Sequence, residues 1–358
     1  MVFVIARNST FAYKGKAIDV KQVGRELGVR YVLEGSVRKS GNRVRVAGQL
    51  IDTASATHVW AERYDRALDD IFALQDELTI SVIGAIELTL RQAEIERARR
   101  KRPDSLDAYD LYLRALPFAF TAMPGDADKA LALLARAIEL EPDYAAAHAI
   151  IAWCHEQRYL RGGLHEEART AALRHARHAI AADGDDAAAL ATAGFVIAVA
   201  ELDYETALTA FDRSFALSNS SALALGFSWI VRAWKGDDAL AVEQAQHALR
   251  LSPFDPLIYL PYVGLAYAHF AAGRFEEAAA AASRANQSNP RFSVPYILHT
   301  AALASLGCRE DARVMTRRLL ELDPGITTTT AILSARYANR ENVAALCNAL
   351  RRAGLPEE

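Results

Sequence analysis

Two short stretches contain residue types that resemble known catalytic motifs. Residues 13–19 read YKGKAID, and a Gly-Lys pair is also part of the loop that holds phosphate in nucleotide-binding proteins. This stretch lacks the upstream glycine and the Ser or Thr of that loop. Residues 165–169 read HEEAR and begin like a zinc-protease helix, but Arg169 stands where the second histidine ligand is required. We therefore expect no catalytic residue and no enzymatic activity from either stretch.

A pair of histidines has a spacing that a metal ion could use. His175 and His178 are three residues apart on a predicted helix, with His165 further upstream. The alternative, two ordinary histidines on a solvated or half-buried helix face, is the interpretation that we favour. The sequence accordingly predicts no metal site and no other cofactor.

The basic run RARRKR at residues 97–102 could bind nucleic acid or an acidic membrane. It stands at the end of a predicted helix, just before Pro103, where positive charge also complements the helix dipole. The net charge of the chain is −3, which gives no general attraction to nucleic acid. We interpret the run as a solvated linker, and expect no nucleic-acid partner for this chain alone.

Composition excludes several classes of protein. Of the 358 residues, 52% are hydrophobic and 24% charged, which predicts a globular chain with a sizeable core. Cys154, Cys308 and Cys347 are far apart and form no CxxC pair, which favours reduced thiols in the cytosol and a cytoplasmic location. The longest nearly apolar stretch, residues 187–200, is below the roughly 18 residues that span a bilayer, so no membrane association is expected.

The helices that would position any site are predicted from a repeated sequence pattern. Residues 273–290 read GRFEEAAAAASRANQSNP, and residues 307–324 read GCREDARVMTRRLLELDP. In both, an alanine follows the glycine after five residues and a proline closes the segment, and the glycines and prolines recur after 34 residues. Such a unit predicts two antiparallel helices, with glycine in the turn, alanine at their close approach and proline after the second helix. One pair cannot bury its apolar face alone, so the pairs must stack.

The same pattern continues towards the N-terminus. The Gly-to-Ala step recurs at Gly125/Ala130, Gly163/Ala168 and Gly236/Ala241. Helices are predicted to close at Pro142, Gly184, Asn219 and Pro253. The third unit lacks both the turn glycine and the closing proline. The unit resembles the tetratricopeptide repeat, and the resemblance covers residues 105–324 as six units, with residues 325–358 expected to form capping helices.

The first hundred residues follow a different pattern. Residues 16–28 have helical spacing, with Gly28 as the stop. Alternating residues on either side of a turn at 39–42 predict two strands, and residues 57–64 a third. An amphipathic helix is predicted from Asp69. Residues 1–100 are therefore predicted to be a small α+β domain with a linker helix.

Residues 6–78, from ARNSTFAYKG to FALQDEL, resemble the TolB amino-terminal-like domain of bacterial signalling proteins. That resemblance implies a place between an effector domain and a tetratricopeptide array. The effector is often a class III adenylyl or guanylyl cyclase domain and sometimes a winged-helix DNA-binding domain. The stretches LRLSPFDPLIY (249–259) and LRRAGLPE (350–357) are similar to the cyclase-linked members.

The chain departs from this family at its start. In the family, a strand and a helix precede the segment that matches residues 1–10, so we expect a truncated domain. We also expect either a fragment or shortened product of a larger protein, or a chain that works without an effector. A strand at residues 2–6 would then have an open edge, which could support self-association. The catalytic residues of the family belong to the effector, so none is carried over.

Family geometry places certain first-helix positions on the concave face of the array. The resulting predicted partner-binding groove is lined by Trp153, Gln157, Phe195, Ile230, Trp234, Tyr267 and Phe270, with Glu156, Ile297 and Ala301 beside them. Each could instead pack between repeats as core, and we expect at least two to be exposed.

The predicted fold is thus mainly α, a tetratricopeptide superhelix preceded by a small truncated α+β domain. The predicted function is a non-catalytic scaffold that binds a protein or peptide partner in its groove. Two alternatives stay open: the regulatory portion of a cyclase signalling protein, and the sensor half of a winged-helix transcription regulator.

Overall fold

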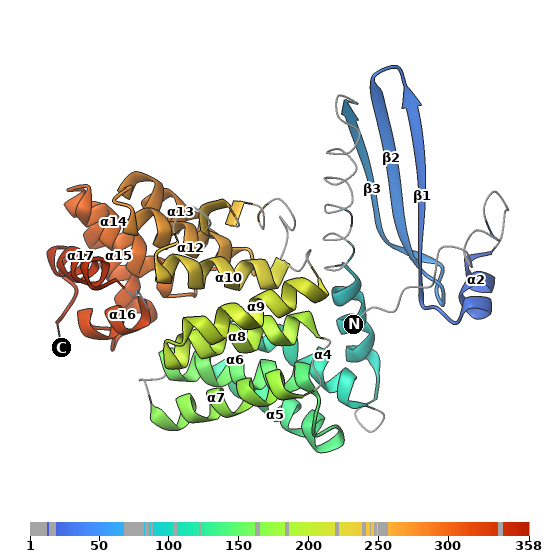
Figure 1. The fold of residues 1–358 in the computed structure, drawn as a ribbon, viewed down its shortest axis with the longest axis horizontal. Coiled ribbons are helices and arrows are strands. Elements are labelled where there is room, and N and C mark those ends of the chain that lie inside the picture. The colour runs from blue at the N-terminus through green and yellow to red at the C-terminus, as the bar shows by residue number, and fades with distance from the viewer. Residues whose placement is uncertain are drawn as a thin grey trace. The chain divides into compact units, whose positions relative to one another are not determined.

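The computed structural model describes residues 13, 19–67, 82, 86, 89–102, 106–121, 123–161, 165–182, 186–218, 222–237, 241–243, 245–246, 249, 257–335 and 339–357. The chain divides into two compact units, Met1–Arg97 and Ala98–Glu358. Each unit is described by itself (Figure 1). The predicted strand at residues 2–6 lies outside the described residues, as do the first turns of the helix predicted from Asp69.

The first unit contains a three-stranded antiparallel sheet in the order β1-β2-β3. The strands are β1 (Tyr31–Ser40), β2 (Arg43–Asp52) and β3 (Thr57–Ala67), so the third strand continues beyond the predicted residue 64. Gly41, in the predicted turn between the first two strands, has φ 56°, which glycine adopts without strain. Arg43 and Arg45, two apart on β2, lie on one face of the sheet and both pair with Asp65 of β3, at 2.9 and 2.8 Å.

Helix α2 (Val20–Leu27) lies within the predicted helix and ends at the predicted stop. The Asp19 side chain accepts from the Lys21 backbone N–H at the start, and Gly28 takes the left-handed conformation at the end. A Cβ at Gly24 would overlap the Thr53 side chain. Glycine at this position therefore lets α2 approach the end of β2 closely.

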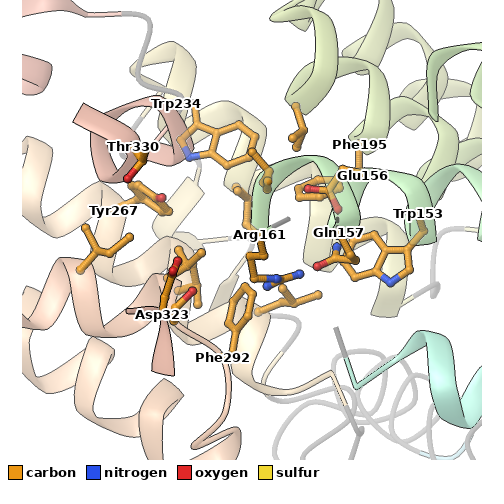
Figure 2. Close-up of a pocket in the computed structure, with 18 of the residues that line it drawn as sticks. Trp153, Glu156, Gln157, Arg161, Phe195, Trp234, Tyr267, Phe292, Asp323 and Thr330 are labelled. Atoms are coloured by element: carbon orange, nitrogen blue, oxygen red, sulfur yellow. Dashed lines mark hydrogen bonds between the residues drawn. The ribbon is translucent and has the colours of Figure 1, made fainter. Parts of the chain in front are cut away.

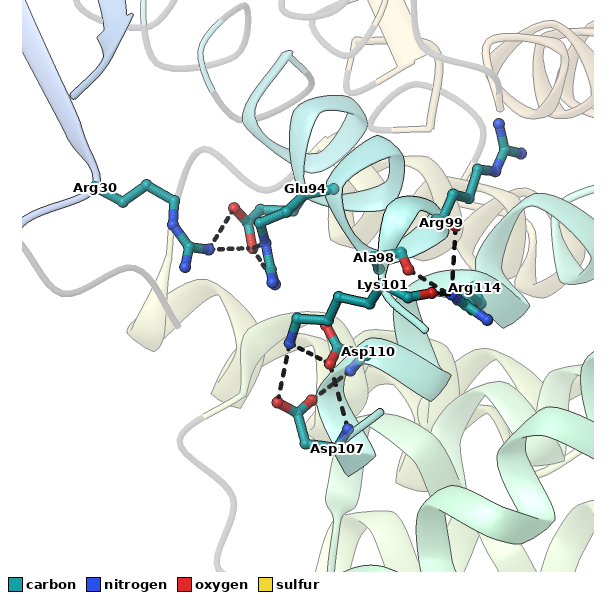
Figure 3. Close-up of polar contacts among 9 residues, drawn as sticks. Arg30, Glu94, Ala98, Arg99, Lys101, Asp107, Asp110 and Arg114 are labelled. Atoms are coloured by element: carbon teal, nitrogen blue, oxygen red, sulfur yellow. Dashed lines mark hydrogen bonds and ion pairs between the residues drawn. The ribbon is translucent and has the colours of Figure 1, made fainter. Parts of the chain in front are cut away.

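Glu94, on helical residues 89–100, joins that helix to the start of β1 (Figure 3). Its carboxylate accepts from Arg30 at 2.9 Å, from the Tyr31 hydroxyl at 2.7 Å and from Arg97 at 2.9 Å. Burial alone would raise the pKa of Glu94, but the hydrogen bonds from Arg97, Tyr31 and Arg30 outweigh burial and hold it below its usual value. The ionised carboxylate is thus the centre of a polar network in the first unit.

The basic run at residues 97–102 stands at the end of that helix, as predicted, and Arg99, Arg100 and Arg102 are exposed. The Arg114 guanidinium donates to carbonyl groups of the run at distances between 2.6 and 3.3 Å, which satisfies acceptors that a helix end leaves open (Figure 3). Lys101 pairs with the buried Asp110 and lies 3.5 Å from Asp107. At least this cation of the run is neutralised within the fold.

The second unit is a series of antiparallel helix pairs that follow one another along the chain (Figure 1). The first five helices are α4 (Ala108–Ala119), α5 (Pro124–Leu140), α6 (Ala145–Arg161), α7 (Glu166–Ala181) and α8 (Ala187–Glu201). They are followed by α9 (Tyr204–Leu217), α10 (Ala222–Lys235), α12 (Tyr259–Ala271), α13 (Phe275–Ser288), α14 (Val294–Ser305) and α15 (Arg309–Leu322). The array ends with α16 (Thr328–Ala335) and α17 (Arg340–Arg352).

Contacts between these helices define an inner layer. Each of α4, α6, α8, α10, α12 and α14 packs against the next one in this series. The intervening helices pack against the first helix of their own pair. This is the stacking of a tetratricopeptide array, so the predicted mainly α fold with a small α+β unit before it is confirmed.

The predicted turn glycines have mixed outcomes. Gly236, Gly273 and Gly307 have φ of 102°, 72° and 80°, so they occupy left-handed turn positions, as predicted. Gly125 lies inside α5 instead, and the prediction for it was wrong. In the third pair, which lacks a glycine, Leu202 itself takes φ 60° between α8 and α9. Gly163 lies outside the described residues.

Small residues at the helix crossings agree with the predicted repeat. Ala130, Ala241, Ala278 and Ala312 are fully buried, whereas Ala168 is only half-buried. The second helices of three pairs end just before Pro142, Pro290 and Pro324. The other predicted closers, Gly184, Asn219 and Pro253, lie outside the described residues.

Candidate functional site

Four aromatic side chains form a ladder along the inner layer. Trp153 on α6 lies 5.7 Å from Phe195 on α8, measured between ring centroids. Phe195 lies 5.8 Å from Trp234 on α10, and Trp234 lies 5.9 Å from Tyr267 on α12 in an edge-on arrangement. These separations are those of favourable aromatic pairs. The structure thus brings together aromatic residues that the sequence placed on four successive first helices.

The ladder forms one wall of a pocket with a cavity volume of about 60 Å³ (Figure 2). The same wall includes Glu156, Gln157, Leu160, Arg161, Val199, Ile230, Leu260 and Val263. The facing wall comes from the far end of the array and consists of Phe292, Ser293, Val294, Ile297, Asp323, Ile326 and Thr330. This volume has room for only a few water molecules. The array therefore curves far enough to close on its own concave face.

Most of the predicted groove residues line this pocket. All seven are buried, with between 2% and 6% of their surface exposed, so the expected open groove is instead a pocket with largely buried walls. Trp153, Gln157, Phe195, Ile230, Trp234 and Tyr267 line this pocket, and so do Glu156 and Ile297. Phe270 packs on Phe275 at 5.4 Å and Ala301 is fully buried, and neither of them lines the pocket.

Sequence reasoning missed Phe227, Arg161 and Phe292. Phe227 stacks on Phe195 at 4.3 Å and lies two helical turns before Trp234 on the same helix, so the helical period could have found it. Arg161 is the last residue of α6, where the repeat pattern makes no prediction. Phe292 lies in the segment before α14, where the repeat pattern makes no prediction.

Three polar atoms of the pocket have no hydrogen-bond partner among the described residues. They are Arg161 Nε, Gln157 Oε1 and Trp234 Nε1, and all three are shielded from solvent. Shielded polar groups in folded proteins are nearly always paired, with protein or with an ordered molecule. Two donors and one acceptor thus lie buried in residues that line the pocket, and they would become available to a ligand if its walls separated.

The charges of the pocket are unequal. Among the described residues that line the pocket, Arg161 is the one cation, and Glu156 and Asp323 are the two acids. Burial lowers the pKa of Arg161, and Glu156, Tyr259 and Asp323 oppose this change. An arginine stays charged in proteins, so the lining carries a net negative charge at neutral pH. The Arg161 guanidinium lies over the Phe292 ring, 4.7 Å from its centroid (Figure 2).

The predicted histidine pair belongs to a different cluster, between α6 and α7. The His175 ring stacks near His148 and His155 at 5.0 and 6.2 Å, and His178 lies 3.9 Å from His148. His165 stands at the start of α7, exposed to solvent. Among the described residues, no group of three His, Cys, Asp or Glu side chains is arranged to hold a metal ion. His175 is half-buried in this cluster, and His178 is exposed to solvent.

Comparison with known proteins gives one curated relative. The chain is 43% identical over 187 residues to the putative adenylate cyclase 3 of Rhizobium meliloti strain 1021. The match spans 52% of this chain and 32% of the relative, so the chain covers about a third of the length of that protein. No family model matches the chain.

Solved structures resemble the helical array at low sequence identity. The APC/C hetero-tetramer Cut9-Hcn1 matches with a TM-score of 0.50 and 14% identity, covering 74% of this chain and 49% of that one. The type IV pilus biogenesis factor PilW matches with a TM-score of 0.44 and 18% identity, over 61% of this chain and 94% of that one. A tetratricopeptide repeat protein from Parabacteroides merdae matches with a TM-score of 0.38 and 15% identity, over 69% of this chain and 89% of that one. Within the described residues, no helix is long and apolar enough to cross a membrane. The chain thus has a tetratricopeptide-type helical array.

Proposed function

We propose that the helical array binds a segment of a partner protein at the concave pocket and that the chain is a non-catalytic scaffold. The observation that carries this proposal is the aromatic ladder from Trp153 to Tyr267 beside three unpaired polar atoms. Aromatic anchors next to a few oriented polar groups dominate the energetics of many interfaces.

The size of the pocket defines what binding requires. A cavity of about 60 Å³ is far below the volume of most ligand sites, so a peptide must part the two walls to enter. The wall from the far end of the array begins in the segment before α14 and continues into α16. A small change in curvature of the stacked pairs would separate the walls without unfolding either one.

A selection from random peptides tests the proposal. Peptides of 12 residues or so would be displayed and selected on the immobilised full chain, and their dissociation constants measured on wild type and variants. We expect binding in the micromolar range, weakened about tenfold by Asp323→Lys at the pocket. Asp212→Lys makes the same charge change at an exposed position of α9 outside the pocket and should leave binding unaltered. Failure to select any peptide, or equal binding by Asp323→Lys, would overturn the proposal.

A second function is favoured by the curated relative. Because the chain is 43% identical to part of a putative adenylate cyclase, we propose as the alternative that it is a regulatory portion of a cyclase signalling protein. In this role it would act on a catalytic domain and make no cyclic AMP itself. Purified to homogeneity and given ATP and a divalent metal, the chain should produce no cyclic AMP. Production that follows the protein through every purification step would show a catalytic centre and refute both functions as stated.

A further inference from the structure

Two consecutive residues of the segment before α14 bind across the concave face. The Phe292 ring lies under the Arg161 guanidinium at the end of α6 (Figure 2). Arg291 Nη1 lies 3.8 Å from Asp126 Oδ2 in the first turn of α5. Asp126 is on α5 and Arg161 on α6, in the first two helix pairs. Arg291 and Phe292 lie between α13 and α14, four pairs further along the array. These two contacts thus fasten distant parts of the array over the pocket.

The two contacts differ in strength. Phe292 is almost fully buried and also packs edge-on against Tyr259 at 5.1 Å. A guanidinium over an aromatic ring is attracted to it, and the attraction is stronger when the contact is dry. The Arg291 side chain is 64% exposed, so its pair with Asp126 adds little stability. A partner ring that displaces Phe292 must therefore bury as much apolar surface as Phe292 does and also contact Arg161.

The surroundings of these contacts favour a cation followed by an aromatic ring. Asp126 accepts from Lys129 at 3.0 Å, and its other carboxylate oxygen faces the Arg291 cation at 3.8 Å. Among the described residues that line the pocket, the two acids Glu156 and Asp323 outnumber the cation Arg161. Arg161 offers the face of a guanidinium to a ring, and its Nε has no acceptor among the described residues. The segment of the chain itself satisfies this pattern in its own sequence order, Arg291 and then Phe292.

We infer that Arg291 and Phe292 occupy the place of the partner, and that the pocket accepts a partner segment in which a basic residue directly precedes an aromatic one. This inference rests on the proposed function and names the chemistry of its partner. The incoming cation takes the place of Arg291 on Asp126, and the incoming ring takes the place of Phe292 on Arg161. The displaced segment then leaves the pocket, and the two walls separate.

The chain provides its own probe for this inference. A labelled synthetic peptide of residues 287–296, QSNPRFSVPY, carries the basic and aromatic residues in the required order. In wild type, the covalent segment competes with it at high effective concentration. In Phe292→Ala the competitor loses its ring, so we expect the peptide to bind about tenfold more tightly than to wild type, measured by fluorescence anisotropy.

Matched controls isolate the site. Phe275→Ala removes a phenylalanine outside the pocket lining and should bind the peptide as wild type does. The peptide QSNPFRSVPY, with the order of the two residues exchanged, should bind Phe292→Ala weakly. Adding Arg161→Gln to Phe292→Ala should abolish the gain. Circular dichroism checks that each variant is folded, and Arg291→Ala, a change at the surface, should give a smaller gain if Phe292→Ala does not fold.

Three results would overturn the inference: no gain in Phe292→Ala or Arg291→Ala, equal binding of the exchanged peptide, or an equal gain in Phe275→Ala. The inference and the proposed function fail separately. Display-selected peptides that need the pocket but lack a basic-aromatic pair would refute the inference and leave the proposed function standing.

Discussion

His148 and His175 share a hydrogen bond between their Nδ1 atoms, which lie 2.8 Å apart between α6 and α7. His148 Nε2 donates to the Pro142 carbonyl at 2.7 Å, and Arg174 Nη2 donates to His175 Nε2 at 3.3 Å. His148 Nδ1 must then accept the proton that His175 Nδ1 donates. Each ring has one donor and one acceptor in use, so a second proton on either ring would break this chain of hydrogen bonds.

This arrangement predicts a loss of stability in mild acid. Burial, followed by the neighbouring His148, lowers the pKa of His175 from 6.5 to about 4, and burial likewise lowers the pKa of His155 to about 4. The unfolded chain therefore takes up protons at a higher pH than the folded chain does. This part of the stability is complete above about pH 6.5 and is lost as the pH falls towards 4.

Thermal melts between pH 7 and pH 4 check this prediction. His175→Gln should flatten the decline, whereas His165→Gln, at an exposed position, should leave it unaltered. Across the cluster, Asp143 lies 3.3 Å from His178, and the charges of Arg158 and Arg174 add to burial in lowering the pKa of His155. A melting temperature that stays constant across this range in wild type would contradict the account.

Gly264 on α12 is predicted to tolerate no side chain. A Cβ there would overlap the ring of Trp229, which is 0% exposed on α10. The ring cannot move aside in a packed interior, so Gly264→Ala should lower the free energy of unfolding by about 3 kcal/mol or more. Gly226→Ala is the matched control, because a Cβ at this position of α10 meets nothing within 4 Å. Chemical denaturation should find the control neutral or slightly more stable.

Replacement of Leu202 by glycine is predicted to raise the stability of the array. It takes φ 60° in the turn where other pairs have glycine, and its side chain is 50% exposed. A non-glycine residue in this conformation costs roughly 1–2 kcal/mol. Glycine relieves this strain, but it also raises the conformational entropy of the unfolded chain, which offsets part of the gain in stability. Leu202→Gly should therefore stabilise the array by about 0.5–1 kcal/mol. Leu202→Ala keeps the strain and should show no such gain; a gain there would mean that loss of the exposed leucine is the cause.

The repeat could be predicted from the sequence because its signals are local. A turn between two helices needs a residue with positive φ, which glycine adopts without strain. Gly236, Gly273 and Gly307 therefore marked their turns in the sequence. Gly125 misled because Pro124 begins a helix efficiently, so the glycine that follows lies within α5 rather than before it. Leu202 could not be foreseen, since nothing in its type favours that conformation.

The candidate site was predicted only in part for a different reason. The geometry of the resembling repeat family placed Trp153, Phe195, Trp234 and Tyr267 on the concave face, and the structure brings their rings together. The closure over them depends on the accumulated curvature of the stacked pairs, which is a sum of small rotations that no short stretch encodes. The position of Phe292 in the pocket wall therefore could not be predicted from the sequence.

The central claim is that a partner segment binds at the pocket, and the unpaired Trp234 Nε1 tests it most directly. Trp234→Phe keeps an aromatic ring in the ladder and removes this donor, whereas Trp60→Phe makes the same change on β3, in the first unit. The measurement is the dissociation constant of a display-selected peptide for wild type and both variants, each shown by circular dichroism to be folded. We predict a weakening of about tenfold for Trp234→Phe, the effect of one lost hydrogen bond, and none for Trp60→Phe. Equal affinities for all three proteins would contradict the claim.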